Sequence, residues 1–196
     1  MKKIALAIIV ISIFLSCIKS SDQPGPENLK CEYLINPIGI DAAAPRLSWQ
    51  IKTDKQGAFQ KAYQVFVGTD SVLVAGGSGN IWESGEVRSA LMPVVFQGQK
   101  LEPFTRYFWG VKIKDEEGKW SNLSQVASFE MGMMGQENWK GSWIFDSKVH
   151  DYNLKPAPYY RKTFEIQKKV KSARAYIAVG GLYELFLNGN KIGNHR

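Results

Sequence analysis

The stretch from Leu101 to Val111 constrains the fold of this sequence more than any other part. Pro103 fixes a corner, and two sets of side chains alternate after it: Thr105, Tyr107, Trp109 and Val111 with Arg106, Phe108, Gly110 and Lys112. This period of two predicts a strand that is buried on at least one face. A tyrosine just past such a corner is typical of Greek-key β-sandwiches, where its hydroxyl bonds back to the chain and pins the crossover between sheets. An ordinary strand with a buried tyrosine is the alternative.

Short β-like runs with turn signals between them continue the pattern on both sides of this stretch. They are residues 29–35, 45–51, 62–69, 81–85, 92–96 and 126–131, while 71–79 is expected to be a loop. With the central strand they make about seven strands, which predicts an all-β, fibronectin type III-like (immunoglobulin-like) β-sandwich over residues 29–132. An aromatic content of 12% suits such a core. Trp49, Tyr107 and Trp109 are the expected structural residues, with Trp49 at the centre.

The N-terminus predicts an exported protein. Two lysines follow Met1, an apolar run extends over residues 4–15, and Ser16 stands before Cys17. This is a secretory signal, too short for a membrane-spanning helix. A small residue just before Cys17 resembles a bacterial lipobox, although Phe14 departs from the usual leucine. We expect residues 1–16 to be a lipoprotein signal peptide, Cys17 to be the lipidation site, and residues 17–28 to be a flexible tether. A soluble secreted protein cut near this point is the alternative.

On the lipoprotein interpretation the chain is held in the cell envelope by a membrane anchor, on the outer membrane or facing the periplasm. The formal charge of +7 becomes +5 without the two N-terminal lysines (7 − 2). That charge is too small and too scattered to favour nucleic acid. With Cys17 lipidated, Cys31 has no disulfide partner and is expected to be a small buried hydrophobe. Two isolated histidines make no zinc site, so neither metal nor cofactor is expected.

Two segments of this domain suggest chemistry. Three consecutive carboxylates, Asp115 to Glu117, cannot flank one bond from opposite sides as acid–base catalysis requires, so they are interpreted as a solvated turn. The segment Trp82-Glu83-Ser84-Gly85 could offer an aromatic platform and a carboxylate to a sugar. An edge strand whose tryptophan covers the core is the simpler interpretation. No residue of this sequence is predicted to be catalytic.

The amino-acid composition changes after the predicted sandwich. Residues 133–158 are expected to be a linker, and residues 159–166, 173–179 and 183–187 have the pattern of strands. Asn188-Gly189 is a strong hairpin-turn signal. Residues 159–196 are thus expected to be the incomplete start of a second, jelly-roll β-sandwich, because three strands without a partner sheet bury too little apolar surface to be stable. From this we expect a truncated reading frame or a gene fragment.

A series of motifs runs in order through residues 29 to 196. They are Asn36-Pro37-x-Gly39-Ile40-Asp41, Pro45-Arg46-Leu47-Ser48-Trp49, Gln60-x-Ala62-Tyr63-Gln64-Val65, Trp82-x-Ser84-Gly85, the corner motif, Trp120-Ser121, Trp143-Ile144, Arg161-Lys162-x-Phe164 and Tyr183-Glu184-Leu185-x-Leu187-Asn188-Gly189-x-Lys191-Ile192-Gly193. In this order they resemble the N-terminal part of a bacterial α-L-rhamnosidase of glycoside hydrolase family 78.

The resemblance implies a multidomain, inverting glycosidase that removes terminal α-L-rhamnosyl residues from glycosides or polysaccharides. One carboxylic acid protonates the leaving oxygen and one carboxylate activates water, and both lie in an (α/α)₆ barrel beyond this sequence. The chain itself is thus expected to be an inactive accessory region. Some attached β-sandwiches bind rhamnose, occasionally with calcium, which makes Tyr183, Glu184 and Asn188 the candidates for sugar binding. Roles in the strand and turn are the alternative, and too few oxygen ligands lie near them for calcium.

A second function of another class stays open. The chain could be a lipid-anchored, immunoglobulin-like module for carbohydrate binding or adhesion, which would need an exposed aromatic patch on the first domain. The expected partners are therefore rhamnose-containing glycans and a membrane. A basic partner-binding strip at residues 168–174 is a weaker idea, because lysines between two strands are usually part of a solvated turn.

Overall fold

The structure is a computed structural model that describes residues 24–148, 153 and 157–193. The predicted signal peptide, Cys17, most of the predicted tether and both histidines lie outside these residues. The chain divides into two compact units, with the boundary between Ser142 and Trp143. Within the described residues, no helix has the length and apolar character needed to cross a bilayer.

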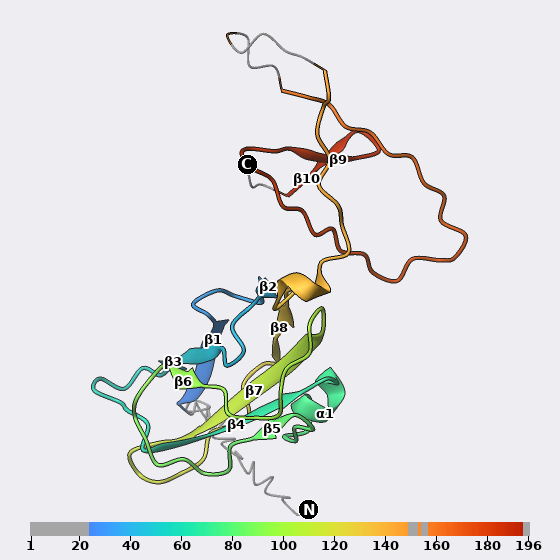
Figure 1. The fold of residues 1–196 in the computed structure, drawn as a ribbon. Helices are drawn as coiled ribbons and strands as arrows, with labels where there is room; N and C mark the ends of the chain where they lie inside the picture. The colour runs from blue at the N-terminus through green and yellow to red at the C-terminus, as the bar shows by residue number, and fades with distance from the viewer. Residues whose placement is uncertain (1–23, 149–152, 154–156, 194–196) are drawn as a thin grey trace, which may run out of the picture. The chain divides into compact units, whose positions relative to one another are not determined.

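The first unit is a sandwich of two β-sheets (Figure 1). The smaller sheet has the order β1-β3-β6, formed by Gly25–Cys31, Arg46–Lys52 and Val94–Val95. The larger sheet has the order β2-β8-β7-β4-β5, formed by Ile38–Ile40, Ala127–Met131, Arg106–Lys114, Ala62–Gly68 and Trp82–Glu83. Buried side chains from both sheets form one hydrophobic core. The predicted all-β, immunoglobulin-like sandwich is confirmed.

The long antiparallel pair β4 and β7 forms the centre of the larger sheet. Val65 lies opposite Val111 and Val67 opposite Trp109, and all four side chains are fully buried. The outer face of this pair is covered as well, by α1 (Ser71–Ala75), whose Val74 packs near Gly110. The expectation of a plain loop at 71–79 was therefore wrong at its start.

A capping residue explains the short helix. Asp70 is the N-cap of α1, and its Oδ1 accepts a hydrogen bond from the Val72 amide at 2.7 Å. Asp is among the residues that best satisfy the free amides at a helix start. Because the helix has little more than one turn, its apolar residues show no helical period that could be seen in the sequence.

The first strand lies earlier than expected. β1 begins at Gly25, where Gly25 pairs with Lys52 and Pro26 with Ile51, so the strand takes up the end of the segment expected to be a tether. It ends at Cys31 because two successive residues, Glu32 and Tyr33, have φ angles of 48° and 65° and turn the chain back, so that Leu34 pairs with Cys31. Residues 32–35 therefore do not extend the strand.

β2 was not predicted from the sequence. It pairs in parallel with β8, with Ile38 opposite Glu130 and Ile40 opposite Met131. The side chain of Asn36 helps to place it, because its Oδ1 accepts a hydrogen bond from the Ser128 amide at 2.8 Å. A strand of three residues is too short to show an alternating pattern.

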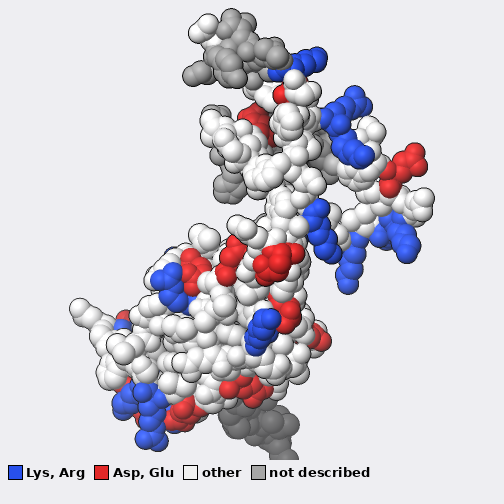
Figure 2. Space-filling view, viewed as in Figure 1, with Lys and Arg blue, Asp and Glu red and all other residues white. Residues whose placement is uncertain are grey.

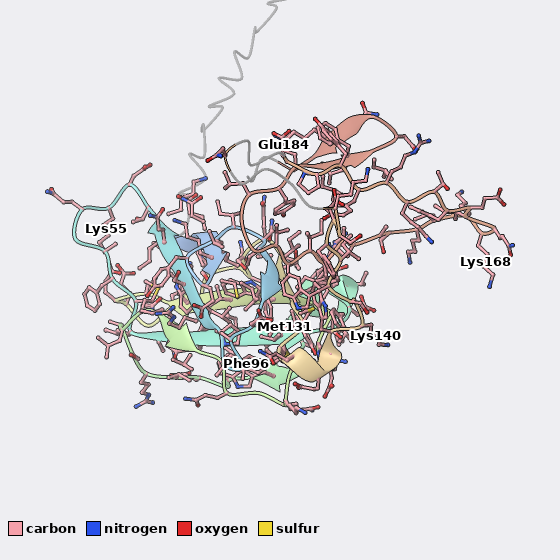
Figure 3. All side chains as sticks on the ribbon, turned by 45° about the horizontal axis from the view of Figure 1, so that its top comes forward. Lys55, Phe96, Met131, Lys140, Lys168 and Glu184 are labelled. Carbon is pink, nitrogen blue, oxygen red and sulfur yellow. The ribbon has the colours of Figure 1, made fainter. Side chains whose placement is uncertain are left out.

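The side chains divide between the core and a mixed surface. Phe96 and Met131 lie in the interior of the sandwich, whereas Lys55 lies on an outer loop (Figure 3). On the visible face of the sandwich, Lys and Arg side chains alternate with Asp and Glu and form no wide field of one sign (Figure 2).

The second unit has one hairpin among its described residues, formed by β9 (Leu185–Leu187) and β10 (Asn190–Ile192). Asn188 and Gly189, with φ of 49° and 81°, form the turn, as predicted for a two-residue turn with both φ angles positive. The strands expected at 159–166 and 173–179 are not formed. The described residues supply no second sheet to cover their apolar side chains, and Phe164 and Ile177 are 64% and 40% exposed.

Candidate functional site

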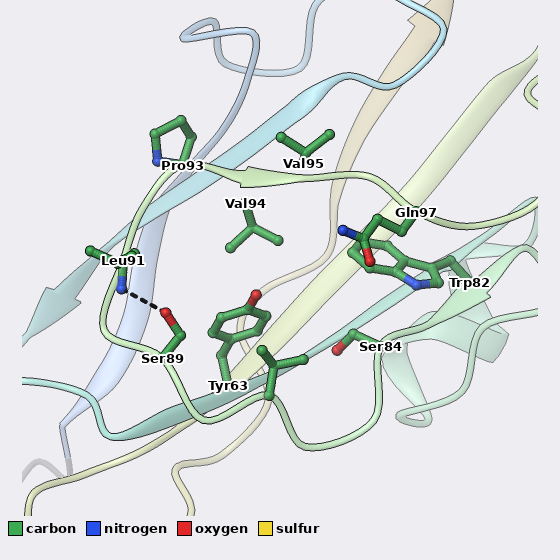
Figure 4. A pocket seen from close by; sticks show the side chains of 10 residues that line it. Tyr63, Trp82, Ser84, Ser89, Leu91, Pro93, Val94, Val95 and Gln97 are labelled. Carbon is green, nitrogen blue, oxygen red and sulfur yellow. Dashed lines mark hydrogen bonds between the residues drawn. The ribbon is translucent and has the colours of Figure 1, made fainter.

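A pocket of about 280 Å³ lies where the edge strands of the two sheets, β5 and β6, come near each other (Figure 4). Its walls come from three separate parts of the chain: β4, the end of β5, and the segment that crosses to β6 and continues beyond it. The lining residues are Tyr63, Trp82, Ser84, Val87, Ser89, Leu91, Pro93, Val94, Val95 and Gln97.

The lining is uncharged and mixed in polarity. Ser84 Oγ accepts a hydrogen bond from the Val65 amide and donates one to the Gly85 carbonyl, both at 2.9 Å, and Ser89 Oγ accepts one from the Leu91 amide at 3.0 Å. These two hydroxyls are therefore already used by the fold.

Three other polar groups of the lining have no hydrogen-bond partner among the described residues. They are the Tyr63 hydroxyl, the Gln97 amide and the Trp82 indole N–H. In Figure 4 the Tyr63 hydroxyl points into the centre of the pocket. Burial raises the pKa of Tyr63, so its hydroxyl stays neutral and can both donate and accept a hydrogen bond.

The frame of the pocket is held by hydrogen bonds to buried residues. The backbones of Tyr63 and Val87 exchange two hydrogen bonds, at 3.0 and 2.9 Å. Gln60 accepts a hydrogen bond from Trp49 Nε1 at 2.9 Å and donates one to the Ser89 carbonyl at 3.3 Å. The crossing segment is thus tied to the core at two points.

Trp82 covers the core and also lines the pocket, so it fits both the edge-strand and the sugar-platform interpretation of its segment. It lies on an edge strand and packs edge-to-face on Phe96, with 5.2 Å between the ring centroids, so it covers the core. It also lines the pocket together with Ser84. Glu83 is not part of the lining. Its Oε1 instead accepts a hydrogen bond from the Gly79 amide at 2.7 Å. The carboxylate therefore supports a turn.

The sugar-binding candidates of the second unit lie around the hairpin. Glu184 forms an ion pair with Lys191 at 2.5 Å, and Asn188 occupies the first position of the turn. Tyr183 precedes β9 and is 36% exposed. Glu184 and Asn188 thus have structural roles, and sugar binding by the three residues stays a prediction.

The three expected structural residues lie in the sandwich core. Trp49 packs edge-to-face on Tyr63, with the ring centroids 5.4 Å apart. The Tyr107 hydroxyl accepts a hydrogen bond from the Glu102 amide at 2.9 Å, which is the geometry of a tyrosine corner. Trp109 is fully buried, and its indole N–H has no acceptor among the described residues.

The other ionisable side chains of the sandwich serve the fold. Asp115 Oδ1 accepts hydrogen bonds from the Glu117 and Lys119 amides at 3.0 and 2.8 Å. Glu116 pairs with Lys55, and this hydrogen bond lowers the pKa of Glu116. Burial raises the pKa of the Cys31 thiol to about 12, so the thiol is inert. Within the described parts of the chain, no group of three or more His, Cys, Asp or Glu side chains could hold a metal ion.

The segment that leaves the sandwich after β8 is tied back to the domain. Asp41 Oδ1 accepts a hydrogen bond from the Met134 amide at 2.8 Å, and the Gly132 amide donates one to the Ile40 carbonyl at 2.7 Å. A side chain at Gly132 would bring its Cβ within 2.5 Å of Asp41 Oδ1. A larger residue at position 132 would therefore push the Asp41 carboxylate away from the Met134 amide.

Residues 26–135 match the family described as the Rha78A-like, N-terminal immunoglobulin domain. The chain belongs to this family. The match covers the sandwich from β1 to the segment after β8, and so includes the pocket of the Rha78A-like domain and its tied exit segment.

The relatives of the Rha78A-like chain are named as alpha-L-rhamnosidases. An alpha-L-rhamnosidase of Formosa agariphila is 32% identical over 82% of this chain and 19% of its own length. An alpha-L-rhamnosidase of Alteromonas sp. is 32% identical over 95% of this chain and 21% of its own length. The chain thus spans about a fifth of the length of these relatives.

Two solved structures resemble the fold. The alpha-L-rhamnosidase from Dictyoglumus thermophilum aligns with a TM-score of 0.61 and 36% identity, over 63% of this chain and 14% of that one. The Streptomyces avermitilis alpha-L-rhamnosidase complexed with L-rhamnose aligns with a TM-score of 0.57 and 36% identity, over 60% of this chain and 11% of that one. The resemblance to rhamnosidases noted in the sequence is confirmed.

The pocket of the Rha78A-like domain was only partly foreseen. The segment Trp82-Glu83-Ser84-Gly85 was considered for its aromatic platform and its carboxylate; Trp82 and Ser84 line the pocket but Glu83 does not, and Tyr63 and Gln97 were not considered. A partial signal existed for Tyr63, since the period of two along β4 places it on the same face as Val65 and Val67, near the start of the strand. Gln97 follows β6 outside any pattern, so the sequence offered no signal for it.

Proposed function

We propose that this chain is the non-catalytic N-terminal accessory region of an α-L-rhamnosidase in the cell envelope, which removes terminal α-L-rhamnosyl residues from glycosides or polysaccharides. The observation that carries the proposal is the family match over residues 26–135. The α-L-rhamnosidase relatives, of which the chain spans about a fifth, support it. On this proposal the catalytic carboxylates belong to a part of the enzyme outside these residues.

The role of the sandwich is then to position its neighbours. Its exit segment suits this role, because Asp41 and the Ile40 carbonyl fasten residues 132–134 to the domain. A fastened connection limits the directions in which the following polypeptide can leave the domain. The described side chains that first suggested chemistry, such as Glu83 and Asp115, are used by turns.

The proposal includes a membrane anchor at Cys17. Lipid on Cys17 would hold the enzyme at a bilayer by the burial of acyl methylenes. Because β1 starts at Gly25, the connection between Cys17 and the sandwich can span at most about 28 Å when fully extended. The sandwich would therefore stay close to the membrane surface.

The test is an activity assay on two products. The complete reading frame that contains this sequence and the 196-residue chain are expressed, purified and incubated with 4-nitrophenyl α-L-rhamnopyranoside, and release of nitrophenol is measured. We expect turnover by a product of the relatives' length and none by the 196-residue chain. Turnover by the 196-residue chain would overturn the assignment as non-catalytic. A longer product that cleaves other glycosides but no rhamnoside would overturn the enzyme assignment.

A further inference from the structure

We propose that the pocket between β5 and β6 binds one neutral monosaccharide residue, specifically a 6-deoxyhexose such as L-rhamnose. The proposal goes beyond an accessory role, because it makes the immunoglobulin-like domain itself a sugar-binding module. It does not depend on what the parent enzyme cleaves. It also differs from the prediction at Tyr183, Glu184 and Asn188, which lie in the other unit.

The first argument is the chemistry of the lining. None of the ten lining residues carries a charge, so the pocket offers no counter-charge to a phosphate, a carboxylate or an ammonium group. It does offer three uncharged polar groups without partners, on Tyr63, Trp82 and Gln97. Tyr63 is buried, and its hydroxyl, together with the more exposed polar groups of Trp82 and Gln97, favours a ligand that both donates and accepts hydrogen bonds. Sugar hydroxyls do both.

The second argument is the arrangement of polar and apolar walls. In Figure 4 Trp82 and Gln97 lie together at one end, Leu91 and Pro93 lie at the opposite end, and the Tyr63 hydroxyl points between them. A sugar ring has an apolar C–H face that packs on an aromatic ring and a rim of hydroxyls. A 6-deoxyhexose adds a methyl group at one pole, and the aliphatic end of the pocket suits this methyl.

The third argument is size and rigidity. A volume of about 280 Å³ lies just below the roughly 300–1,000 Å³ of pockets for drug-sized ligands, which fits a single sugar ring rather than a peptide or a nucleotide. The Tyr63–Val87 backbone pair and the Gln60–Ser89 bond hold two walls in place. A rigid frame lowers the entropy cost of binding. The pocket is reachable from solvent, since Leu91 at its rim is 80% exposed.

The test is a titration of the 196-residue chain with L-rhamnose, D-glucose and D-glucuronate, followed by backbone amide shifts in NMR and by tryptophan fluorescence. We expect saturable shifts in residues 82–97 with L-rhamnose, at a Kd of about 1 mM because the ligand is small. D-Glucose should bind more weakly, since its hydroxymethyl group would meet the aliphatic end. D-Glucuronate should not bind, because no charge lines the pocket.

Two substitutions locate the site without removing its aromatic wall. Tyr63→Phe deletes one hydroxyl, and Gln97→Ala deletes one exposed amide. Each should weaken L-rhamnose binding by roughly 3- to 10-fold, the effect of one hydrogen bond. The matched controls outside the lining are Tyr33→Phe and Gln125→Ala, which should leave the Kd unchanged. Amide spectra of each variant show whether the fold is kept.

Three outcomes would overturn the proposal. They are the absence of any saturable shift with L-rhamnose, shifts centred outside the pocket, and equal weakening by the control variants. Binding of D-glucuronate as tightly as L-rhamnose would also contradict the uncharged site. None of these results depends on the rhamnosidase assay, so a failure of this proposal is distinguishable from a failure of the proposed function.

Discussion

A single hydroxyl group joins the two halves of the corner at which β7 begins. Tyr107 is only 2% exposed, and its hydroxyl accepts a hydrogen bond from the Glu102 amide at 2.9 Å. Tyr107→Phe keeps the ring in the core and leaves this amide without its partner. We expect a loss of about 1–2 kcal/mol in the free energy of unfolding, measured by urea denaturation with an unchanged m-value.

The control for this substitution is Tyr33→Phe. The Tyr33 hydroxyl accepts a hydrogen bond from Arg46 at 3.2 Å on the surface, and the side chain is 57% exposed. Water can replace that contact, so the loss should stay below about 0.5 kcal/mol. Equal losses in the two variants would show that the corner bond contributes nothing special to stability.

At the scale of the strand, the exit from β8 is the element whose contacts can be tested separately. Asp41→Ala removes the acceptor of the Met134 amide, so the exit segment should open more often. We expect hydrogen exchange at the Met134 amide to be roughly fivefold faster, the effect of about 1 kcal/mol in the opening free energy. The measurement is amide exchange followed by NMR.

Two further variants serve as controls for Asp41→Ala. Asp41→Asn keeps an oxygen acceptor and should restore much of the protection, whereas Asp54→Ala, in the loop after β3, should not change exchange at Met134. If Asp41→Ala leaves the exchange rate unchanged, the segment is held by the Gly132–Ile40 and Phe104–Gly132 backbone bonds alone.

The elements differ in how well the sequence predicted them. β7 was foreseen because its buried and less buried positions alternate over most of its length, and β4 because it is a short apolar run rich in β-branched and aromatic residues, buried at nearly every position. The start of β1 was missed, since Gly25 and Pro26 resemble a tether until Lys52 and Ile51 pair with them. β2 and α1 are too short for any period to show. Their formation depends on a partner strand and on one capping residue.

At the scale of the whole molecule, the pocket shows why a binding site is harder to predict than a fold. Its polar groups come from β4, β5 and the segment after β6, and only pairing of the strands brings Tyr63, Trp82 and Gln97 together. Trp82 could be recognised because a tryptophan beside a carboxylate in one short segment suggests a sugar platform. The contribution of Gln97 depends on tertiary structure, which a local pattern does not contain.

The remaining prediction concerns where the molecule resides. Two signals point to Cys17: the apolar run before it and the small residue directly ahead of it. If Cys17 is lipidated, the protein should sediment with membranes and enter the detergent phase on phase separation with Triton X-114. Cys17→Ser removes the thiol that accepts the lipid, so this variant should lose most of its membrane association. The intact mass of the native protein, captured by an antibody against residues 29–131, should show the mass of the acyl chains.

Cys31→Ala is the matched control for the anchor. Cys31 is 1% exposed in the sandwich core, so its thiol is out of reach of a lipid transferase and the variant should remain in the membrane fraction. A Cys17→Ser protein that still sediments with membranes would contradict lipid anchoring, because one acylated residue is the whole of the proposed attachment. The sandwich would then be held at the envelope by binding to another component, and the uncharged pocket beside Trp82 would be the first surface to test by Gln97→Ala in the same fractionation.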